Sequence, residues 1–471
     1  MIGGSMAGLL AARALAGTYE EVLIVDRDVL PSGPVHRAGV PQSRHAHWLL
    51  AGGLEALESF FPGISGELVA EGATSLDPQQ DCAWFFDGHP VERAPSDMTC
   101  LMMSRTLLES RVRARTEGLP GVRTLPRHEV TGLLATTGGG RIDGVRAVRR
   151  GRPGPVLELR ADLVVDASGR ASRTPLWLRE LGYRPPREDR VRVGVTYVTR
   201  RYRRASHHLP GILAIGRHVT PDRRRGAALY PSEDGCWMVT LAGVLDQEPP
   251  LDTDAFTAYG CSLGDPGLRQ ILGEAEPLDV PVRARFPEAF RRRYERLRRP
   301  PEGLVVIGDA MCATNPTLAH GMSVAALQAQ ALRDCLRTGT AGLARRYHRR
   351  AARVLTVPWT ATRTSDVGPY ASGRRRSAFL WAADLARTAL CAAMERDAAV
   401  TRACLRLAHL TRGRRVLFSP RVLAGVVSAL ARLALPSVPS GQGGGPPSGR
   451  PPQPRRTPDR DHEIETRLPL P

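Results

Sequence analysis

The stretch that decides the fold is residues 302–332, EGLVVIGDAMCATNPTLAHGMSVAALQAQAL. Residues 304–307 form a short apolar run, rich in β-branched side chains, that predicts a fully buried strand of a parallel sheet. An acidic turn with Asp309 follows, and an apolar, Ala-rich helix is expected over roughly 323–338. Asp309 can accept hydrogen bonds from sugar hydroxyls, and free N–H groups at the helix start can hold negative charge. The stretch predicts a site for a polar ligand, but on this motif alone an ordinary strand–loop–helix unit explains it equally well.

The N-terminus has the pattern of a dinucleotide-binding unit. Gly3 and Gly8 take the first and last places of a GxGxxG fingerprint, and Ser5 takes the middle place. The first glycine permits a tight turn, and the last allows close packing of the helix on the strand. Ser5 must let its backbone approach a pyrophosphate, and its hydroxyl is a candidate donor to the phosphate. Asp26 ends a second strand over 22–25, where we favour a role in reading ribose hydroxyls over that of a surface turn residue.

The first strand of this unit is short in the sequence. Only Met1 and Ile2 precede Gly3, whereas a first strand needs about five residues and a central place in the sheet. We therefore expect that the reading frame as given begins a few apolar residues late, or that the strand is stunted.

A third buried strand ends in an acidic, glycine-bearing turn. Residues 161–170 read ADLVVDASGR, with Asp166 at the strand end and Gly169 in the turn. The chain thus has three strand ends of the type that binds phosphate or ribose, and this set is far more specific than any single glycine pattern.

In this order the three strand ends resemble the motifs of FAD-dependent, single-component monooxygenases. The resemblance extends from Gly3 to about Arg432. Residues 37–47, RAGVPQSRHAH, and the His320-Gly321-Met322 string are most similar to bacterial epoxidases of polyether-antibiotic pathways, which also have His where the family usually has Gln. The chain departs from the family at Ala319, where a Gly is usual and the backbone needs a positive φ.

The resemblance implies FAD as the cofactor. The family's Asp binds the ribityl chain, its helix N-terminus faces the flavin pyrimidine, and one Arg approaches the pyrophosphate. The implied catalytic residues are His320, Gly321 and Met322. The cofactor-binding residues are Gly3, Ser5, Gly8, Asp26, Arg27, Arg37, Val40, Pro41, Arg105, Asp166, Gly169, Gly308, Asp309, Pro316, Ala319, Gly321 and Met322.

Three histidines near these motifs need separate interpretation. His45 and His47 lie close together, but no carboxylate or Cys completes a metal site, so hydrogen-bonded loop residues are expected and no metal is predicted. His320 is expected to shape the loop by a structural hydrogen bond, because the family's Gln cannot titrate. A proton donor to the flavin is the alternative.

The predicted fold class is α/β, with a Rossmann-like FAD-binding domain, an inserted and mainly antiparallel substrate sheet, and a C-terminal helical region. Alternating apolar residues over 190–201 and a hairpin over 227–241 indicate the second sheet, with one face free to cover a substrate. An Arg-rich helix is expected to end at Arg299, and residues 358–372 read as a loop. The predicted domains are 1–60, 98–185 and 300–357 for FAD, 61–97 and 186–299 for substrate, 358–435 for the helices, and a disordered Pro/Gly/Arg-rich tail over 436–471.

Composition narrows the possible partners. The formal net charge is +19, and every one of the 66 basic residues is Arg. These arginines are spread along the chain rather than clustered with aromatics, which argues against nucleic-acid binding. The eight cysteines form no CxxC pair, and no run of about 18 apolar residues occurs, so we expect a reduced, cytoplasmic protein without a spanning helix. Packing against the other domains is preferred for the C-terminal helices, and peripheral membrane contact is the alternative.

The chemistry that the resemblance implies is oxygen insertion. NAD(P)H would reduce FAD, O₂ would form a flavin C4a-hydroperoxide, and one oxygen atom would pass to an apolar polyene or polyketide substrate. We favour epoxidation, because hydroxylation of a phenol needs a base or a Tyr and no candidate stands out. A flavin halogenase is rejected, because the chain has neither Lys nor a WxWxI string. A prenyl-chain reductase and a catalytically degenerate FAD-binding protein remain alternatives, and a separate flavin reductase is a possible partner.

Overall fold

The computed structural model describes residues 1–151, 154–220, 223–364 and 378–434. Its first layer is a parallel sheet built from widely separated segments. Strand β1 (Val22–Val25) pairs with β7 (Val122–Leu125), and β11 (Val164–Asp166) pairs with β17 (Leu304–Val306). Ile2 joins the two pairs, because it bridges both Val25 and Asp166 in parallel. The buried strand expected over 304–307 is thus confirmed, and residues 1–2 fill the central place in the sheet.

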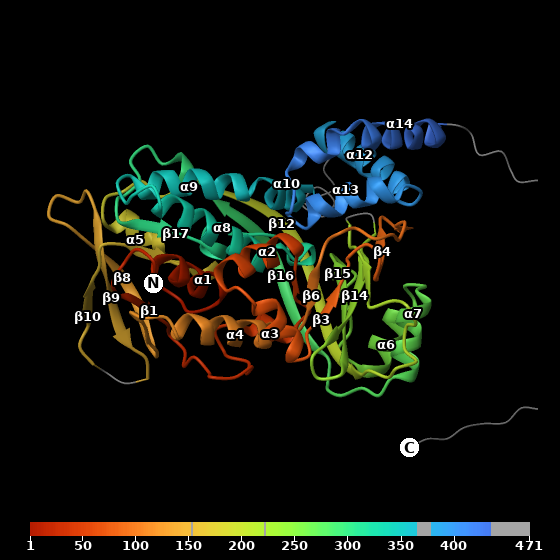
Figure 1. Ribbon diagram of the computed structural model, residues 1–471, viewed down its shortest axis with the longest axis horizontal. Coiled ribbons are helices and arrows are strands. Elements are labelled where there is room, and N and C mark those ends of the chain that lie inside the picture. The colour runs from red at the N-terminus through yellow and green to blue at the C-terminus, as the bar shows by residue number, and fades with distance from the viewer. Residues whose placement is uncertain (152–153, 221–222, 365–377, 435–471) are drawn as a thin grey trace, which may run out of the picture.

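Helices cover this sheet. Helix α1 (Met6–Leu15) packs against α8 (His320–Leu336) and α4 (Arg105–Glu117), and α9 (Leu343–Val354) packs on α8 and β17. In Figure 1 these helices lie together on one side of the molecule, next to an antiparallel sheet that forms its outer edge. That sheet contains β8 (His128–Ala135), β9 (Ile142–Arg149) and β10 (Leu157–Arg160).

The second layer is a large, mostly antiparallel sheet, as the alternating pattern predicts. Its apolar side chains divide between two faces: Val198 and Trp237 pack against helices α6 (Thr253–Cys261) and α7 (Pro266–Glu274), whereas Val195 joins the core of the parallel sheet. In spatial order its strands are β18 (Cys312–Ala313), β16 (Val282–Arg292), β12 (Glu188–Arg203), β15 (Cys236–Val244), β14 (Arg225–Ser232), β13 (Ala214–Arg217), β4 (Cys82–Phe86) and β5 (His89–Pro90).

A small connecting unit joins the two layers. It holds the three-stranded antiparallel sheet β2–β6–β3 and two helices, α2 and α3. Its elements are β2 (Trp48–Leu49), α2 (Ala51–Phe60), α3 (Ile64–Ala70), β3 (Thr74–Leu76) and β6 (Cys100–Met102). Helix α5 (Thr174–Glu180), which follows the middle motif, packs against β8 instead.

The prediction of an Arg-rich helix that ends at Arg299 is wrong. Strand β16 continues to Arg292, where it pairs with Glu188 of β12, and only a short 3-10 turn, Tyr294–Arg296, follows. The arginines face acidic partners on β12: Arg292 Nε lies 2.9 Å from Glu188 Oε2, and Arg293 Nε lies 2.7 Å from Asp189 Oδ2. Cross-strand ion pairing explains the strand, since opposite charges on neighbouring strands stabilise their pairing.

The C-terminal helices lie beside the large sheet, near β4 (Figure 1). They are α10 (Thr356–Thr364), α12 (Ala378–Met394), α13 (Ala398–Ala408) and α14 (Pro420–Ala434). The prediction of a loop over 358–372 is wrong for its first part, because α10 includes residues 358–364. Pro358 does not prevent this helix, since it lies in the first turn, where the missing N–H has no intrahelical partner. Residues 365–377 and the tail over 436–471 lie outside the described part, and no helix within the described part is long and apolar enough to cross a membrane.

Candidate functional site

The three strand-end motifs meet at one edge of the parallel sheet. Gly3 N donates to Val25 O at 2.8 Å, and Ile2 N donates to Val165 O at 2.8 Å. Ile307 N donates to Asp166 O at 2.9 Å, which ties the last motif to the middle one. These backbone bonds bring segments that are up to 300 residues apart in sequence into one cluster, as the carboxyl ends of neighbouring parallel strands require.

Close backbone contacts explain the glycines of two motifs. Gly3 has φ +95°, and a Cβ there would lie 2.8 Å from Ala167 O. A Cβ on Gly8 would lie only 1.9 Å from Gly3 O, so α1 packs as tightly on the strand as the fingerprint predicts. Gly308 has φ +65°, and its Cβ would meet the Ala7 Cβ at 2.7 Å. The acidic turn of the last motif therefore packs directly on the first turn of α1.

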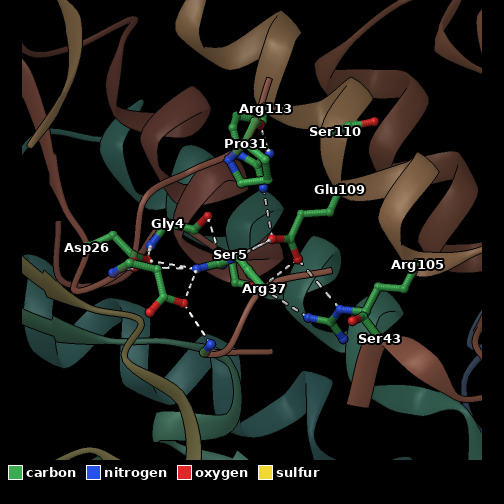
Figure 2. Close-up of polar contacts among 12 residues, drawn as sticks. Gly4, Ser5, Asp26, Pro31, Arg37, Ser43, Arg105, Glu109, Ser110 and Arg113 are labelled. Atoms are coloured by element: carbon green, nitrogen blue, oxygen red, sulfur yellow. Dashed lines mark hydrogen bonds and ion pairs between the residues drawn. The ribbon is translucent and has the colours of Figure 1, made fainter. Parts of the chain in front are cut away.

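Asp26 is an anchored acceptor beside this turn. Its carboxylate accepts from Gly4 N at 2.7 Å and from Asp28 N at 2.8 Å. Arg37 approaches both oxygens only at 3.4 Å, which is beyond a good hydrogen bond (Figure 2). Asp26 thus keeps acceptor capacity next to Gly4, where the fingerprint places a ribose. Arg27 is exposed.

Glu109 is the centre of a buried ion-pair network that the sequence reasoning missed. Arg37 donates to its Oε1 through Nε at 3.1 Å and Nη2 at 3.0 Å, and Arg113 Nη2 lies 3.0 Å from the same oxygen (Figure 2). Ser5 Oγ donates to Oε2 at 2.8 Å and accepts from Arg105 Nη2 at 3.0 Å. Burial pushes the pKa of Glu109 up, but Arg105 and Arg37 outweigh it, so the pKa lies below its usual value.

This network changes two expectations. The Ser5 hydroxyl is directed to Glu109 in this structure instead of being free for a phosphate. Arg37 and Arg105, the two arginines expected near a pyrophosphate, are held together by one carboxylate. A signal was present in the sequence, because Arg105, Glu109 and Arg113 are spaced four residues apart and must share one face of α4.

The middle motif uses its carboxylate internally. Asp166 is fully buried and accepts from Ser168 N at 2.9 Å, Ser168 Oγ at 2.6 Å, Ser172 Oγ at 2.5 Å and Thr174 Oγ1 at 2.7 Å. Asp166 therefore shapes the turn that contains Gly169, and its predicted role as a direct FAD ligand stays a prediction.

Asp309 differs from Asp166. Within the part of the chain that the structure describes, its half-buried carboxylate makes no hydrogen bond or ion pair. Desolvation raises its pKa, while Arg105 and Arg170 act in the opposite direction. A carboxylate with no protein partner at a strand end is an acceptor available to a ligand.

The loop before α8 has the backbone that the family's Gly predicts. Asn315 Oδ1 accepts from Thr317 N at 3.0 Å and forms the turn that begins with Pro316. Ala319 follows with φ 53° and ψ 19°, the left-handed conformation. Helix α8 then begins at His320, three residues earlier than expected, and no side chain caps its first N–H groups.

His320, Gly321 and Met322 face different surroundings. His320 is buried, and its Nε2 donates to Ala408 O of α13 at 3.1 Å. Gly321 is exposed, and a Cβ there would meet nothing within 4 Å, so space remains beside the free helix N-terminus. Met322 packs into the core.

The loop over 37–47 connects the two halves of the site. Val40 is buried and Pro41 begins a 3-10 turn. His45 Nδ1 contacts Thr199 Oγ1 at 3.0 Å, and His47 Nδ1 contacts His45 O at 2.8 Å. Both histidines are thus hydrogen-bonded loop residues, as expected.

On the large sheet, Tyr197 faces this same region. Its ring lies edge-on to His45 with centroids 4.8 Å apart, and it is half-buried against the core of the parallel sheet. No hydrogen bond of its hydroxyl occurs within the described residues. Arg170, from the middle motif, lies over the Phe286 ring at 3.8 Å and adds a positive charge near Tyr197. Sequence analysis placed Tyr197 on a sheet face but did not recognise it as a site residue.

One group of possible metal ligands lies outside this site. His207, His208 and Glu274 bring ligand atoms within 4.8 Å of one another. Trp237 Nε1 donates to His208 Nδ1 at 3.2 Å, so the neutral His208 ring carries its proton on Nε2 and offers no free ligand nitrogen. We assign no metal to this group.

Comparison with solved structures identifies the fold as that of FAD-dependent monooxygenases and halogenases. The chain superposes on flavin-dependent brominase Bmp2 with a TM-score of 0.60, at 14% identity over 92% of this chain and 97% of that one. It superposes on p-nitrophenol 4-monooxygenase PnpA from Pseudomonas putida DLL-E4 with a TM-score of 0.59, at 18% identity over 88% of this chain and 98% of that one. For a flavoprotein/dehydrogenase from Cytophaga hutchinsonii the TM-score is 0.63, at 15% identity over 91% of this chain and 97% of that one.

At the level of sequence the chain has a defined relative. It belongs to the same family as Protein Rv3254 of Mycobacterium tuberculosis (strain ATCC 25618 / H37Rv), with 34% identity over 393 residues, 78% of this chain and 79% of the relative. No family model matches the chain.

Proposed function

We propose that the chain is an FAD-dependent monooxygenase that inserts one oxygen atom of O₂ into an apolar small molecule, by epoxidation of a polyene or polyketide-type substrate. The observation that supports this most directly is Asp309. Its carboxylate has no protein partner within the described residues, and it lies in the turn that packs on the first turn of α1. The first N–H groups of α8, later in the same motif, have no side-chain cap. A ligand with hydroxyls at one end and a region of negative charge at the other would satisfy both.

The residues present fit FAD. Gly3 and Gly8 permit the tight strand–helix turn over which the fingerprint binds a pyrophosphate, and Asp26 retains acceptor capacity for ribose hydroxyls. Arg37 and Arg105 carry the positive charge that a pyrophosphate needs. Asp309 would accept from the ribityl hydroxyls, and the N–H groups at Gly321 and Met322 would face the flavin pyrimidine, as in the family that the sequence resembles.

When bound, FAD supplies the redox and oxygen chemistry, with NAD(P)H as electron donor, delivered directly or through a flavin reductase. The protein contributes binding, orientation and exclusion of water. Residues of the large sheet would form the substrate side, because Phe286 and Tyr197 are partly buried against the same core as the parallel sheet. All eight cysteines are unpaired, and six of them are buried, which supports a reducing compartment.

Hydroxylation of an aromatic or polyketide substrate is the second candidate, and Tyr197 favours it. A phenol hydroxyl without a protein partner can hydrogen-bond a hydroxyl of the substrate and assist its proton transfer. Epoxidation requires no such group. A halogenase is disfavoured by the lack of Lys in the chain, although halogenases share the fold. A prenyl-chain reductase or a degenerate FAD-binding protein would bind FAD without consuming O₂ in step with substrate.

The proposal is tested by reconstituting the purified protein with FAD and following NADH and NADPH oxidation together with O₂ uptake and peroxide release. We expect flavin absorbance and substrate-stimulated O₂ consumption with a panel of polyenes or phenols. Product formation from the polyenes alone would identify epoxidation, and formation from the phenols alone would identify hydroxylation. FAD binding with reduction of an alkene and no O₂ uptake would overturn the monooxygenase proposal in favour of the reductase.

A further inference from the structure

We propose that His320 is a positioning residue, whose hydrogen bond to Ala408 allows the C-terminal helical region to hold Ala319 in its left-handed conformation at the start of α8. This inference concerns the flavin-side loop and rests on the proposed function. It assigns the C-terminal helices a task in cofactor binding that the sequence motifs do not contain.

The loop has a conformational problem that its own residues do not solve. Ala319 has φ 53° and ψ 19°, and residues other than Gly, Asn and Asp adopt this region at an energetic cost. Ala319 has no polar side chain with which to offset that cost, and no side chain caps α8. Asn315 stabilises the preceding turn through Thr317, and its N–H donates to Thr362 Oγ1 of α10 at 3.2 Å, but both contacts lie before residue 319. A contact from outside the loop is therefore needed to hold it.

His320 provides that contact. Its Nε2 donates to the Ala408 carbonyl at 3.1 Å, and its side chain is buried, adjacent in sequence to the strained residue. Because a carbonyl only accepts, the neutral ring has its proton on Nε2, and Nδ1 has no partner within the described residues. Burial lowers the pKa of His320 to about 4, despite the opposing effect of the Ala408 carbonyl, so the ring stays neutral near pH 7 and is a poor proton donor.

The end of α13 is itself firmly anchored. Gly52 N donates to His409 O at 2.9 Å, and Ala51 N lies 3.4 Å from His409 Nδ1. A Cβ on Gly52 would lie 2.7 Å from Leu410 O and 2.8 Å from His409 O, so α2 and the end of α13 are in direct backbone contact. Ala408 is thus a fixed acceptor rather than part of a mobile end.

The same region also anchors α8. Leu50 N donates to Ser323 Oγ at 3.1 Å, and a Cβ on Gly53 would lie 2.4 Å from that hydroxyl oxygen. Helices α2, α8 and α13 therefore meet within one turn of Ala319. The loop conformation depends on all three, and His320 is the side chain that connects the loop to α13.

The test is a double-mutant cycle of His320→Ala and Ala319→Gly. FAD affinity is measured by quenching of flavin fluorescence, and hydrogen exchange of residues 316–322 is measured in FAD-free protein. We expect His320→Ala to weaken FAD binding about fivefold and to speed exchange, because the binding-competent loop becomes a minor population. With Gly at 319 the left-handed backbone has no steric cost, so adding His320→Ala should change affinity less than twofold.

Two further variants sharpen the cycle. His320→Gln keeps an N–H donor and should restore most of the affinity lost in His320→Ala. Gly52→Ala displaces the end of α13, against which Gly52 of α2 packs, and so perturbs the acceptor of the His320 hydrogen bond. Its effect on the loop should therefore not add to that of His320→Ala. His320→Asn serves as the second donor variant if His320→Ala does not fold.

His348→Ala is the matched control. His348 is equally buried and accepts from Val306 N at 3.2 Å, but it contacts β17 rather than the loop. Its effects should add to those of Ala319→Gly. Additive effects of His320→Ala and Ala319→Gly, or equal losses in His320→Gln and His320→Ala, would overturn the inference. If neither the unaltered chain nor any variant bound FAD, the proposed function would fail. The exchange data would still decide whether His320 holds the loop.

Discussion

The two turns of the proposed FAD site are stabilised in opposite ways. The turn at residues 3–8 is fixed by glycine contacts and by charges, because Glu109 forms ion pairs with Arg37, Arg105 and Arg113. The loop at residues 315–321 has no ion pair within the described residues. It is held by the Asn315 turn, by Thr362 of α10 and by a backbone carbonyl of α13. The first turn is rigid before any ligand binds. The second leaves the N–H groups at the start of α8 without a side-chain cap, and there a cofactor would contribute most to order.

The largest expected difference between these two turns is their response to acidification. Burial lowers the pKa of His320 to about 4 and that of His409 to about 3, and these two lie where the second loop meets α13. Burial also lowers the pKa of His45, in the loop over 37–47, to about 4. Because these pKa values lie below the unfolded value of about 6.5, neutral histidines stabilise the fold above pH 6.5, and this stability is lost as the pH falls toward 4. These three groups contribute a slope of about 4 kcal/mol per pH unit. Burial also lowers the pKa of His47 and His348 to about 3 and that of His218 to about 4, so these histidines make the global slope steeper.

Urea unfolding at pH 7, 6 and 5 checks this expectation, with hydrogen exchange to locate the opening. Relative to the slower intrinsic exchange at pH 5, residues 316–322 should lose protection well before residues 3–8 do. His320→Gln should reduce the slope by about one proton. An unfolding free energy that is unchanged between pH 7 and 5 would show that these histidines are not neutral and buried.

Glycine substitutions compare the two turns directly. Gly8→Ala places a Cβ 1.9 Å from Gly3 O, so we expect a loss of about 3 kcal/mol in unfolding free energy, together with loss of FAD binding. Gly321→Ala meets nothing within 4 Å and should leave stability unchanged or slightly higher, since Ala favours a helix. It should nevertheless weaken FAD binding, because the methyl enters the space at the helix start. Thermal unfolding and FAD titration separate these results, and equal loss of stability in both variants would contradict the comparison.

Substitution of the two strand-end aspartates should affect different properties, FAD affinity in one case and stability in the other. Asp309→Ala removes an acceptor that no protein group uses, so FAD affinity should fall about tenfold or more while stability is retained. Asp166→Ala leaves four donors of its own turn without their acceptor and should cost about 2–3 kcal/mol of stability. Isothermal titration with FAD and chemical unfolding of both variants test this. The account would be wrong if Asp166→Ala were as stable as the unaltered chain.

The local motifs could be predicted from the sequence, and the contacts between distant segments could not. Gly3, Gly8 and the buried strand of the last motif follow from spacing and periodicity, because the residues that create the constraint are adjacent in the chain. The positive φ at Ala319 followed from the resemblance alone. The partner of His320 lies 88 residues away and is a backbone carbonyl, which leaves no side-chain signal in a single sequence. Likewise, nothing in the pattern of residues 288–293 distinguished a helix from a strand until Glu188 and Asp189 were seen opposite its arginines.

The smallest effect is expected at Tyr197. Tyr197→Phe removes a hydroxyl without a protein partner in the described residues, so unfolding free energy and FAD affinity should change little. Binding of phenol, followed by difference spectra of the FAD-bound protein, should weaken severalfold if the hydroxyl faces the substrate. Unchanged phenol binding would remove the observation that favours hydroxylation and leave epoxidation as the better candidate.

The central claim is that the three strand ends form an FAD site, and the flavin content of the purified protein tests it most directly. After reconstitution with FAD and removal of free ligand, the account predicts a flavin spectrum corresponding to about one FAD per chain, with acid precipitation releasing the flavin, since the binding is non-covalent. Asp309→Ala, matched with Glu117→Gln on the exposed end of α4, should lose flavin while the control retains it. A folded, reconstituted protein without flavin absorbance, or one in which Asp309→Ala retains as much FAD as the control, would contradict the account.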